Sequence, residues 1–437
     1  MVSMRSNDAA ILKKVFFSGV HAVTGYGAVH HAVRPTTRGI EIAGKEYRFG
    51  YYKKIIVVGA GKASFSMARA IDEVLGSRID NGIVITKYGY AGRLKHIDVF
   101  EAGHPFPDQN GIEATKRLMS LAAHVDRYTL VLMLLSGGAS SLLVAPDGVS
   151  LKDKILTTAL LLRSGAGIDE LNIVRKHLSR VKGGRLARLF YPARTVTLII
   201  SDVIGNRLGS IGSGPTVEDT STPAQALEIL DRFHLKKEVP AAVITRLEQR
   251  NMGPAVRPGP ARARNVIIAD NRKAVDAGKA ESRRLGLRPL ILTTRLHGEA
   301  RSVGHELAAL AQRTANRKYR KSRPICMISS GETTVTVQGT GKGGRSQELA
   351  LGFAIDISGK KGITLLSAGT DGTDGPTDAA GALVDGTTAD RMERSGMDPA
   401  AYLLNNDSYT VLDRVGALFR TGPTGTNVMD IQVILVS

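Results

Sequence analysis

The stretch KIIVVGAGKAS (residues 54–64) decides the fold class of this chain. A run of β-branched residues meets two closely spaced glycines, and an amphipathic segment then continues to Leu75. This order predicts a buried strand, a tight turn and a helix. Two further apolar runs, Thr129–Leu135 and Thr195–Ser201, have the continuous hydrophobicity of strands that are buried on both faces. The alternation therefore predicts a doubly wound parallel sheet.

A second alternation of strand and helix patterns begins after a Pro- and Gly-rich stretch at residues 251–262. Val266–Ala269 and Pro324–Ser329 are two of its predicted strands. We therefore expect an α/β protein of two domains. Residues 1–255 would hold the doubly wound parallel sheet, and residues 256–437 would form a smaller α/β domain with a mixed sheet.

The composition is that of an ordinary soluble chain. Of 437 residues, 43% are hydrophobic and 23% are charged, which excludes a collagen, a coiled coil and a globally disordered protein. No apolar run reaches the ~18 residues that a membrane span requires, so we expect no membrane association. Residues 1–34 lack the pattern of a signal peptide. The single Cys326 can form neither an intrachain disulfide nor a cysteine metal site. These features favour a cytoplasmic protein.

The net charge of +19 is unevenly distributed. Residues 331–437 contain eight Lys or Arg against thirteen Asp or Glu, so the excess of positive charge lies in residues 1–330. A basic surface suits nucleic acid or an anionic metabolite. The sequence contains no zinc-finger spacing, RNA-recognition aromatic motif or basic zipper, and Trp is absent. We therefore expect small anionic substrates and no nucleic acid.

The first candidate anion site is the turn that holds Gly59, Gly61 and Lys62. Backbone N–H groups at the start of a helix favour an anion. A lysine in the first helical turn opposes the helix dipole, and an anionic ligand would offset that repulsion. The spacing fails the P-loop pattern, and Ser64 stands where a dinucleotide fingerprint has its third glycine. The alternative is a plain connection between a strand and a helix.

A second glycine-rich turn, SGGASS (residues 136–141), follows the second apolar run. Adjacent glycines permit close approach of the backbone to a ligand, and serine hydroxyls can donate to phosphate. We expect Ser136, Gly137, Gly138 and Ser141 to bind phosphate or substrate. The alternative is a tight turn that is capped by serine.

Asp202 comes directly after the third apolar run, and Asn206 lies in the Gly- and Pro-rich loop at residues 205–223. Open α/β sheets bind ligands at the carboxyl ends of their parallel strands. A carboxylate there can accept a proton or hold a cation. We therefore assign Asp202 a catalytic role and Asn206 a binding role. The alternative is an aspartate that only caps a turn or a helix.

Two polar loops of the C-terminal part carry further candidates. Gly343 and Gly344 precede Arg345, which opens a predicted helix. A guanidinium suits a phosphate or carboxylate, so Arg345 is a candidate catalytic residue and the two glycines are candidate phosphate-binding residues, with a surface hairpin as the alternative. Asp371 and Asp374 lie among turn-forming residues, and oxygen ligands at this density suit Mg²⁺. Aspartates in such turns also often bond only to their own backbone.

The ten histidines form no metal-binding pattern such as H-x-x-x-H or H-E-x-x-H. His104 lies in the loop GHPFPD (residues 103–108) and could touch substrate, but packing of the loop is the simpler interpretation. The sequence therefore predicts no histidine-based metal site.

Taken together, these stretches resemble the class II glycerate kinases, the glycerate 2-kinase family, some members of which carry an older hydroxypyruvate reductase name. The resemblance spans about residues 8–435. It implies a Rossmann-like N-terminal domain, a smaller C-terminal α/β domain and a cleft between them, with ATP, a divalent cation and D-glycerate as ligands. It also implies catalytic roles for Lys62, Asp202 and Arg345. The motifs that carry it are GAGKAS (59–64), GHPFPD (103–108), LLSGGASSLL (134–143), NIVRKHLSRVKGGRLA (172–187), SDVIGN with GSGPT (201–216), GGRSQELAL (343–351) and AGTDGTDGPTDAAG (368–381).

The expected activity is ATP-dependent phosphorylation of D-glycerate by a monomer or homodimer, with the 2-hydroxyl as the acceptor that the resemblance favours. Asp202 would orient or deprotonate that hydroxyl, while Lys62 and Arg345 would neutralise the glycerate carboxylate or the transferred phosphoryl group. A hydroxypyruvate reductase that uses a pyridine nucleotide is the alternative enzyme. Two features argue against the reductase. The dinucleotide fingerprint is incomplete, and the next predicted strand ends in Lys87 with no acidic residue soon after it, where a dinucleotide-binding fold would have one. A nucleic-acid or anion-binding module is the alternative without catalysis, and it leaves the aspartate-rich loop unexplained.

Overall fold

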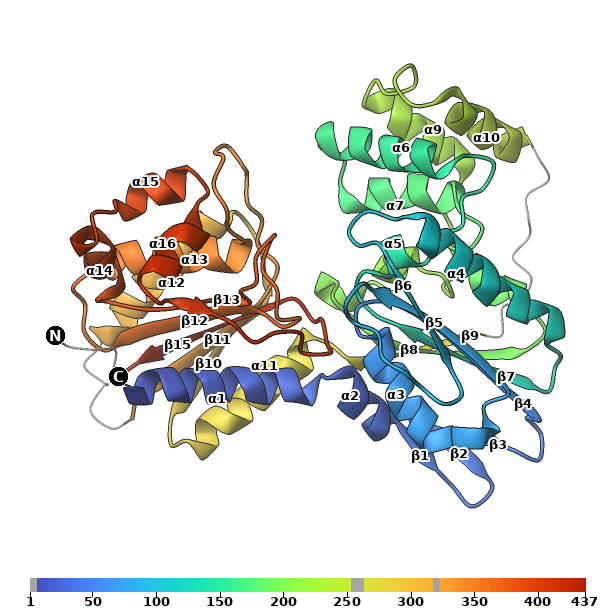
Figure 1. Cartoon of the computed structure of the whole chain (residues 1–437), viewed down its shortest axis with the longest axis horizontal. Coiled ribbons are helices and arrows are strands. Elements are labelled where there is room, and N and C mark those ends of the chain that lie inside the picture. The colour runs from blue at the N-terminus through green and yellow to red at the C-terminus, as the bar shows by residue number, and fades with distance from the viewer. Residues whose placement is uncertain (1–5, 253–262, 317–322) are drawn as a thin grey trace. The chain divides into compact units, whose positions relative to one another are not determined.

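The computed structural model describes residues 6–252, 263–316 and 323–437, and the chain divides into two compact units. The first unit, Gly25–Ile268, is called the central unit here. The second unit joins the residues up to Thr24 with Ala269–Ser437 and is called the terminal unit. Each unit is an α/β structure with its own large sheet (Figure 1), which confirms the predicted fold class.

The central unit is built on six strands: β4 (Lys54–Ala60), β5 (Asn81–Lys87), β6 (Asp98–Ala102), β7 (Thr129–Leu135), β8 (Arg194–Ile200) and β9 (Ala263–Ala269). They lie in the order β6-β5-β4-β7-β8-β9, and the pairings from β6 to β8 are all parallel. From β4 the chain adds β5 and β6 on one side of the sheet, and from β7 it adds β8 and β9 on the other side. This is the strand order of a Rossmann fold, and the direction reverses between β4 and β7.

The strands of this sheet are apolar along their whole length because both faces are covered. Every residue of β7 is buried, and β4 is buried from Ile55 onward. The helices near the sheet are α3 (Ser64–Leu75), α4 (Gln109–Ser120), α5 (Ala139–Leu142) and α8 (Arg185–Leu189), with short 3₁₀ turns η1 (Gly76–Arg78), η2 (Leu121–His124), η3 (Ile204–Asn206) and η4 (Ile211–Ser213). Helix α2 (Gly25–Ala32) leads into a small antiparallel sheet of β1 (Val33–Pro35), β2 (Gly39–Ile42) and β3 (Lys45–Arg48).

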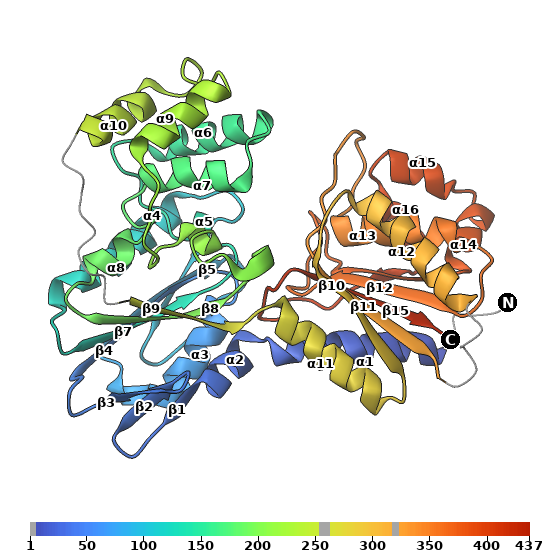
Figure 2. The same cartoon turned by 180° about the vertical axis from the view of Figure 1, so that it is seen from behind.

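Four helices of the central unit form a separate layer (Figures 1 and 2). They are α6 (Leu151–Arg163), α7 (Ile168–His177), α9 (Pro223–Arg232) and α10 (Ala241–Met252). Leu171, Leu230 and Leu247 belong to the apolar cluster that holds this layer together. Within the described ranges, no helix has the length and apolar character that a membrane crossing requires.

The terminal unit has a mixed sheet in the order β10-β11-β15-β12-β13-β14, as the sequence predicts for this part of the chain. Only β10 and β11 pair in parallel, and the other four pairings are antiparallel. The strands are β10 (Arg288–Leu296), β11 (Ile325–Gly331), β12 (Ile363–Gly369), β13 (Gly381–Asp385), β14 (Leu418–Phe419) and β15 (Asp430–Val436).

Helices cover both faces of the terminal sheet (Figures 1 and 2). Helices α12 (Ala300–Ala315) and α13 (Arg345–Asp356) pack together on one face, and α1 (Ser6–Ala22) and α11 (Asn271–Arg284) pack together on the other. The short helices α14 (Thr388–Arg394), α15 (Pro399–Leu404) and α16 (Ser408–Arg414) adjoin α13.

Helix α1 lies in a different unit from the one that the sequence predicts. The expected domain of residues 1–255 would place α1 with the central sheet, but α1 belongs to the terminal unit. Its Phe16 is fully buried and meets the Phe419 ring edge-on, with 5.4 Å between ring centroids. Apolar periodicity indicates that a helix has a buried face, but it does not say which sheet that face covers. The expected boundary between residues 255 and 256 lies outside the described residues.

The contact between Phe16 and Phe419 predicts that α1 stabilises the terminal unit. Replacing Phe16 by alanine removes a fully buried ring and should lower the free energy of unfolding by about 3–5 kcal/mol. Lys14→Ala, an exposed change on the same helix, should cost less than about 0.5 kcal/mol. Chemical denaturation of both variants measures the difference. A Phe16→Ala protein as stable as Lys14→Ala would show that α1 contributes little.

Candidate active site

Three predicted functional positions follow neighbouring strands of the central sheet. Lys62 follows β4, Ser136 follows β7 and Asp202 follows β8, and these strands are adjacent and parallel. Parallel strands end at the same edge of a sheet, and β4 and β8 are about 10 Å apart because each strand spacing is about 4.8 Å. The topology therefore gathers these residues at the edge where Rossmann-type sheets bind ligands.

The two glycine-rich turns at this edge are hydrogen-bonded to each other. The Lys62 amide donates to the Gly137 carbonyl at 2.8 Å, and the Ala63 amide donates to the Ser136 hydroxyl oxygen at 3.0 Å. The Ser136 amide in turn donates to the Ala60 carbonyl at 3.2 Å. The Ser136 hydroxyl, which the sequence suggested as a phosphate ligand, thus accepts a hydrogen bond at the start of α3.

Gly61 and Gly59 are required for this close approach. Gly61 has φ +136°, and a Cβ atom there would lie 2.1 Å from the Ser136 hydroxyl oxygen. At Gly59, a Cβ atom would lie 2.9 Å from the Leu134 carbonyl oxygen. Both glycines therefore allow the strands and turns to pack together, whether or not they also approach a ligand.

Lys62, His104 and Gly138 lie together at the start of α5. Gly138 has φ +84°, and a Cβ atom there would lie 2.9 Å from Cδ2 of His104 and 3.4 Å from Cγ of Lys62. The amides of Gly137 and Gly138 donate to no group in the part of the chain that the structure describes. Two such amides, with the side chain of a lysine beside a left-handed glycine, form an arrangement that suits an anion.

His104 is held in place by a residue that was expected to bind substrate. The Ser141 hydroxyl donates to the Pro105 carbonyl at 2.7 Å, so it fastens the loop that carries His104. The sequence favoured simple packing for this loop. The only sequence signal for its place at the site is the GHPFPD motif, which does not say which turn the loop meets.

Asp202 and Asn206 lie where the chain leaves β8. Asp202 is half-buried, and the loop after it turns sharply through Gly205 and Asn206, which both have positive φ. The Asn206 amide donates to the Val203 carbonyl at 2.9 Å. The following turn, η4, packs on α5, since a Cβ atom at Gly212 would lie 3.1 Å from Cβ of Ala139. The loop is therefore fixed against the second glycine-rich turn.

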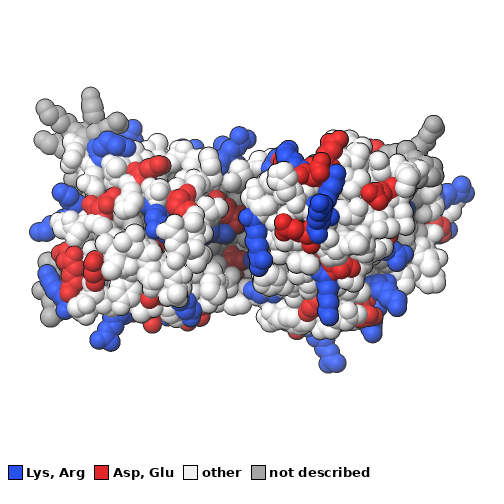
Figure 3. All heavy atoms as spheres, turned by 90° about the horizontal axis from the view of Figure 1, so that it is seen from above, with Lys and Arg blue, Asp and Glu red and all other residues white. Residues whose placement is uncertain are grey.

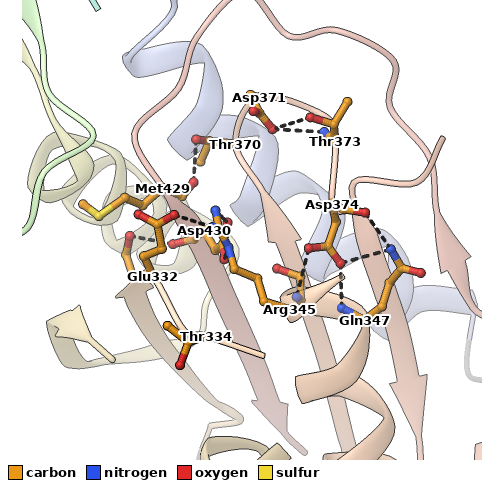
Figure 4. A network of polar contacts seen from close by, with 12 residues as sticks. Glu332, Thr334, Arg345, Gln347, Thr370, Asp371, Thr373, Asp374, Met429 and Asp430 are labelled. Carbon is orange, nitrogen blue, oxygen red and sulfur yellow. Dashed lines mark hydrogen bonds and ion pairs between the residues drawn. The ribbon is translucent and has the colours of Figure 1, made fainter. Parts of the chain in front are cut away.

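Arg345 begins α13 in the terminal unit and is bound by two carboxylates (Figure 4). Its Nε donates to Asp430 at 2.6 Å and its Nη2 donates to the other oxygen of Asp430 at 3.0 Å. Its Nη1 also donates to Glu332. Burial disfavours the charge of Arg345, but Asp430 and then Glu332 outweigh that effect and raise its pKa above the ordinary value.

The partners of Arg345 were missed by sequence reasoning. Glu332 follows β11 and Asp430 begins β15, and the antiparallel register places Gly331 opposite Asp430. Asp430 is buried although it opens an apolar strand with no motif around it. Only the pairing of β11 with β15 brings these carboxylates together, so no local signal could have found Asp430.

Asp374 caps the start of α13 (Figure 4). One carboxylate oxygen accepts from the Ser346 amide at 3.1 Å, and the other accepts from the Gln347 amide at 2.8 Å and from the Gln347 side chain at 3.0 Å. Burial raises the pKa of Asp374 to about 7, and the nearby Asp430 acts in the same direction, while the two amides oppose the shift.

The glycines before α13 make room for these contacts. A Cβ atom at Gly344 would lie 2.3 Å from the carboxyl carbon of Asp374, and one at Gly343 would lie 2.3 Å from the Ser408 hydroxyl. The preceding segment is bound to the 405–407 turn, where the Gly341 amide donates to the Asn405 carbonyl at 3.0 Å. These glycines thus serve close packing in the terminal unit.

The aspartate pair does not fit a metal site made by protein groups. Both oxygens of Asp374 accept from α13, and one oxygen of Asp371 accepts from the amide and the hydroxyl of Thr373 at 3.0 and 3.1 Å. Asp371 thus bonds to its own turn, which was the alternative for these residues. Among the described residues, no group of three His, Cys, Asp or Glu side chains could hold a metal ion.

Comparisons with known proteins identify the family of this chain. It is 45% identical to the D-glycerate 2-kinase of Thermotoga maritima over 387 residues, which cover 88% of this chain and 91% of that protein. It is 41% identical to the glycerate 2-kinase of Pyrococcus horikoshii over 96% of this chain and 95% of that protein. The chain belongs to the glycerate 2-kinase family. The hydroxypyruvate reductase name also occurs among relatives in this family.

The structural comparison agrees with this family assignment. The crystal structure of the Thermotoga maritima glycerate kinase matches with a TM-score of 0.85 and 41% sequence identity, over 99% of this chain and 100% of that one. Residues 11–248 match a family described as a domain of unknown function, DUF4147, and residues 325–430 match the MOFRL family. The central unit thus holds most of the first match, and the terminal unit holds the second.

The close contact between Gly61 and Ser136 predicts that any side chain at position 61 would strongly destabilise the fold. Gly61→Ala should lower the free energy of unfolding by at least about 3 kcal/mol, since it combines an unfavourable φ with a clash against Ser136. Gly89→Ala also has positive φ, but its Cβ atom would meet no atom of the described residues within 4 Å, and it should cost about 1–2 kcal/mol. Chemical denaturation of both variants tests this, and equal losses would contradict the clash.

The raised pKa of Asp374 predicts that stability falls as pH rises from about 4 to about 7. In this window the folded protein binds more protons than the unfolded chain, in which aspartate ionises near pH 3.9. The group should contribute a decline of up to about 1.4 kcal/mol per pH unit, ending above about pH 7. Denaturant titrations across this range should show the decline in the wild type and not in Asp374→Asn.

Asp378→Asn is the matched control for the pH experiment. Asp378 lies in the same loop but is exposed, and hydrogen bonds from Arg420 and Tyr409 lower its pKa. It should leave the decline between about pH 4 and 7 in place. An Asp374→Asn protein with the wild-type pH profile would refute the raised pKa.

Proposed function

We propose that this chain transfers the γ-phosphoryl group of ATP to the 2-hydroxyl of D-glycerate and releases ADP and 2-phosphoglycerate. The observation that carries the proposal is the cluster of Lys62 with the Gly137 and Gly138 amides at the ligand-binding edge of a Rossmann-ordered sheet. This cluster offers positive charge and backbone donors to a phosphate or carboxylate. The names of the relatives supply the substrate.

Phosphoryl transfer depends chiefly on positioning and on neutralising charge. Lys62 would neutralise the transferring phosphoryl group or the glycerate carboxylate, beside the Gly137 and Gly138 amides. Asp202 would orient the attacking hydroxyl and accept its proton. The hydroxyl oxygen bonds to the γ-phosphorus as the bond from that phosphorus to the β,γ-bridging oxygen breaks, and the electron pair of that bond leaves with ADP.

Arg345 would assist as a guanidinium that two carboxylates hold in place. A guanidinium has five N–H groups, and three of its nitrogens donate to Asp430 and Glu332. The remaining capacity suits one oxygen of an anionic ligand. Because Asp371 and Asp374 are engaged within the terminal unit, a divalent cation would be bound mainly by ATP phosphates and water.

A pyridine-nucleotide reductase remains the second candidate because the strand order is that of a dinucleotide-binding fold. The first turn argues against it. The Ser64 hydroxyl, at the position of the third fingerprint glycine, donates to the carbonyls of Gly61 and Ile85 at 2.7 and 2.9 Å. A nucleic-acid module has less support, since acidic side chains lie among the basic ones on the face drawn in Figure 3.

Activity assays separate the two enzyme candidates. ADP release that requires D-glycerate, with phosphorus NMR identifying 2-phosphoglycerate, is the expected result. Oxidation of NADH or NADPH by hydroxypyruvate, without ADP release from ATP and glycerate, would replace the kinase with the reductase.

Replacing Lys62 by methionine should reduce kcat by a few hundred-fold, because a transition-state charge contact contributes about 3–4 kcal/mol. Lys62 is half-buried, so the variant should fold normally. Lys54→Met is the matched control, since Lys54 is exposed at the opposite end of the same strand. Coupled ADP assays measure both, and an active Lys62→Met enzyme would remove this lysine from the mechanism.

A further inference from the structure

The segment NIVRKHLSRVKGGRLA (residues 172–187) has no role in the mechanism above, yet its helical part lines a cavity of about 300 Å³ in the central unit. Asn172 and Lys176 line the cavity from one face of α7, because residues four positions apart share a face of a helix. The other lining residues belong to the loop after Asn206 and to the start of α9. Helices α7 and α9 lie side by side in the separate helical layer (Figures 1 and 2).

Asn172 brings an unused hydrogen-bond donor to this cavity. The residue is only 5% exposed, and its Oδ1 accepts from the Ser213 hydroxyl at 2.9 Å. Its Nδ2 donates to no residue in the described ranges. A buried amide without a partner is costly, and nearly all such groups in proteins are hydrogen-bonded. Because Asn172 lines the cavity, the acceptor for this donor must come from the cavity itself.

Lys176 supplies a positive charge to the same cavity. Its ammonium donates to Asp219 at 3.1 Å, and its side chain is 14% exposed. An ammonium has three N–H groups, so two remain for a ligand. The absence of a side chain at Gly209 keeps the space beside this ammonium open. A Cβ atom at Gly209 would lie 3.9 Å from the Lys176 nitrogen and within 4 Å of no other described atom.

Ser210 adds a neutral donor to the cavity. It is half-buried, and its hydroxyl forms no hydrogen bond with any residue that the structure describes. Its backbone is fixed, because its amide donates to the Arg207 carbonyl at 2.9 Å. Three groups with unused donors therefore line one cavity, namely the Asn172 amide, the Lys176 ammonium and the Ser210 hydroxyl. The oxygens of an anionic group are suitable acceptors for such a set.

The charge of the lining favours a carboxylate over a phosphate. Lys176 is paired with Asp219, and Arg207, which also lines the cavity, is paired with Asp169. Since each cation is already balanced by one acid, the lining suits a single negative charge better than the two charges of a phosphate dianion. The lining residues between positions 220 and 225 are all polar, and they suit the hydroxyl groups of a ligand.

We propose that this cavity binds a small hydroxylated carboxylate through Asn172, Lys176 and Ser210. Its volume is at the lower end of the range for small-molecule sites, so it suits a molecule of a few carbon atoms rather than a nucleotide. Neither Lys62 nor Asp202 lines the cavity, which makes it a second site beside the one at the strand edge. Binding requires no turnover, so the proposal does not depend on the kinase assignment.

Binding of D-glycerate tests the proposal, and Lys62→Met serves as the background because it weakens the site at the strand edge. Isothermal titration of the full-length Lys62→Met protein should show saturable binding of D-glycerate. Adding Gly209→Ala places a methyl group beside the Lys176 ammonium and should weaken this binding at least about tenfold. Equal affinity with and without Gly209→Ala would overturn the site, and so would an absence of binding to Lys62→Met.

Gly167→Ala is the matched control for the added methyl group. Gly167 directly precedes α7 but does not line the cavity, and a Cβ atom there would meet only Oε2 of Glu170, at 3.6 Å. This change should leave the affinity for D-glycerate within about twofold. Neither Gly167 nor Gly209 has positive φ, so both variants should fold normally. If Gly209→Ala melts much lower, Ser210→Ala takes its place and should weaken binding about 3- to 10-fold, since it removes one hydrogen bond.

Asn172→Asp distinguishes a ligand contact from a structural role. Aspartate keeps the oxygen that accepts from Ser213, but it replaces the unused donor by a second oxygen and adds a negative charge. D-glycerate should then bind at least about tenfold more weakly. A purely structural asparagine would instead give a lower melting temperature with unchanged affinity, and that result would contradict the proposal.

Two simpler anions identify the chemical class of the ligand. Acetate and inorganic phosphate are each titrated into Lys62→Met with and without Gly209→Ala. Acetate should bind more weakly than D-glycerate, because it has no hydroxyl groups, and its binding should also be weakened by Gly209→Ala. The affinity for inorganic phosphate should not change. If phosphate loses more affinity than D-glycerate does, the cavity is not a carboxylate site and the proposal is refuted.

Turnover shows whether the cavity is separate from the site of the reaction. Gly209→Ala alone should keep glycerate-dependent ADP release within about threefold of the wild type at saturating D-glycerate. Loss of this activity would make the cavity the acceptor site of the reaction and overturn its assignment as a second site. D-glycerate binding that Gly209→Ala weakens, together with no ADP release by the wild type, would support the cavity and refute the kinase.

Discussion

The central unit depends on the hydrogen bonds that join its two glycine-rich turns. The Lys62 amide meets the Gly137 carbonyl and the Ala63 amide meets the Ser136 hydroxyl, and this is possible only because Gly61 carries no side chain. The joined turns fix the start of α3 relative to the start of α5. They thereby bring the side chain of Lys62 over Gly138, with amides beside it that are available to an anion.

The terminal unit fixes Arg345 by a different set of contacts. Asp374 accepts the first amides of α13, and Asp430 with Glu332 binds the guanidinium of Arg345, which is the first residue of that helix. The start of the helix and the arginine are therefore fixed by separate carboxylates. Such an arrangement leaves the Arg345 side chain little conformational freedom.

Part of the positive charge of the central unit lies in its interior. Several of its cations lie in the interior, where Lys182 is bound by carbonyls and Lys154 by no described group. Charge of this kind does not form a surface for nucleic acid.

The sequence by itself determined the α/β fold class, the parallel central sheet, the mixed terminal sheet and the family. Continuous apolar runs such as Thr129–Leu135 are typical of strands that are covered on both faces, and the motifs at their ends are expected at the edge where such sheets bind ligands. The positions of Lys62 and Asp202 at the ends of two strands could be predicted from the sequence for this reason. Each position depends only on the strand that directly precedes it in the sequence.

Only the tertiary structure decided which distant groups meet. Ser136 binds the first turn, Asp374 caps a helix, and Asp430 pairs with Arg345 across 85 positions of the chain. Helix α1 covers the terminal sheet, although its sequence indicates only that one face is buried. Periodicity and turn chemistry act over a few residues, whereas these contacts depend on strand order and register.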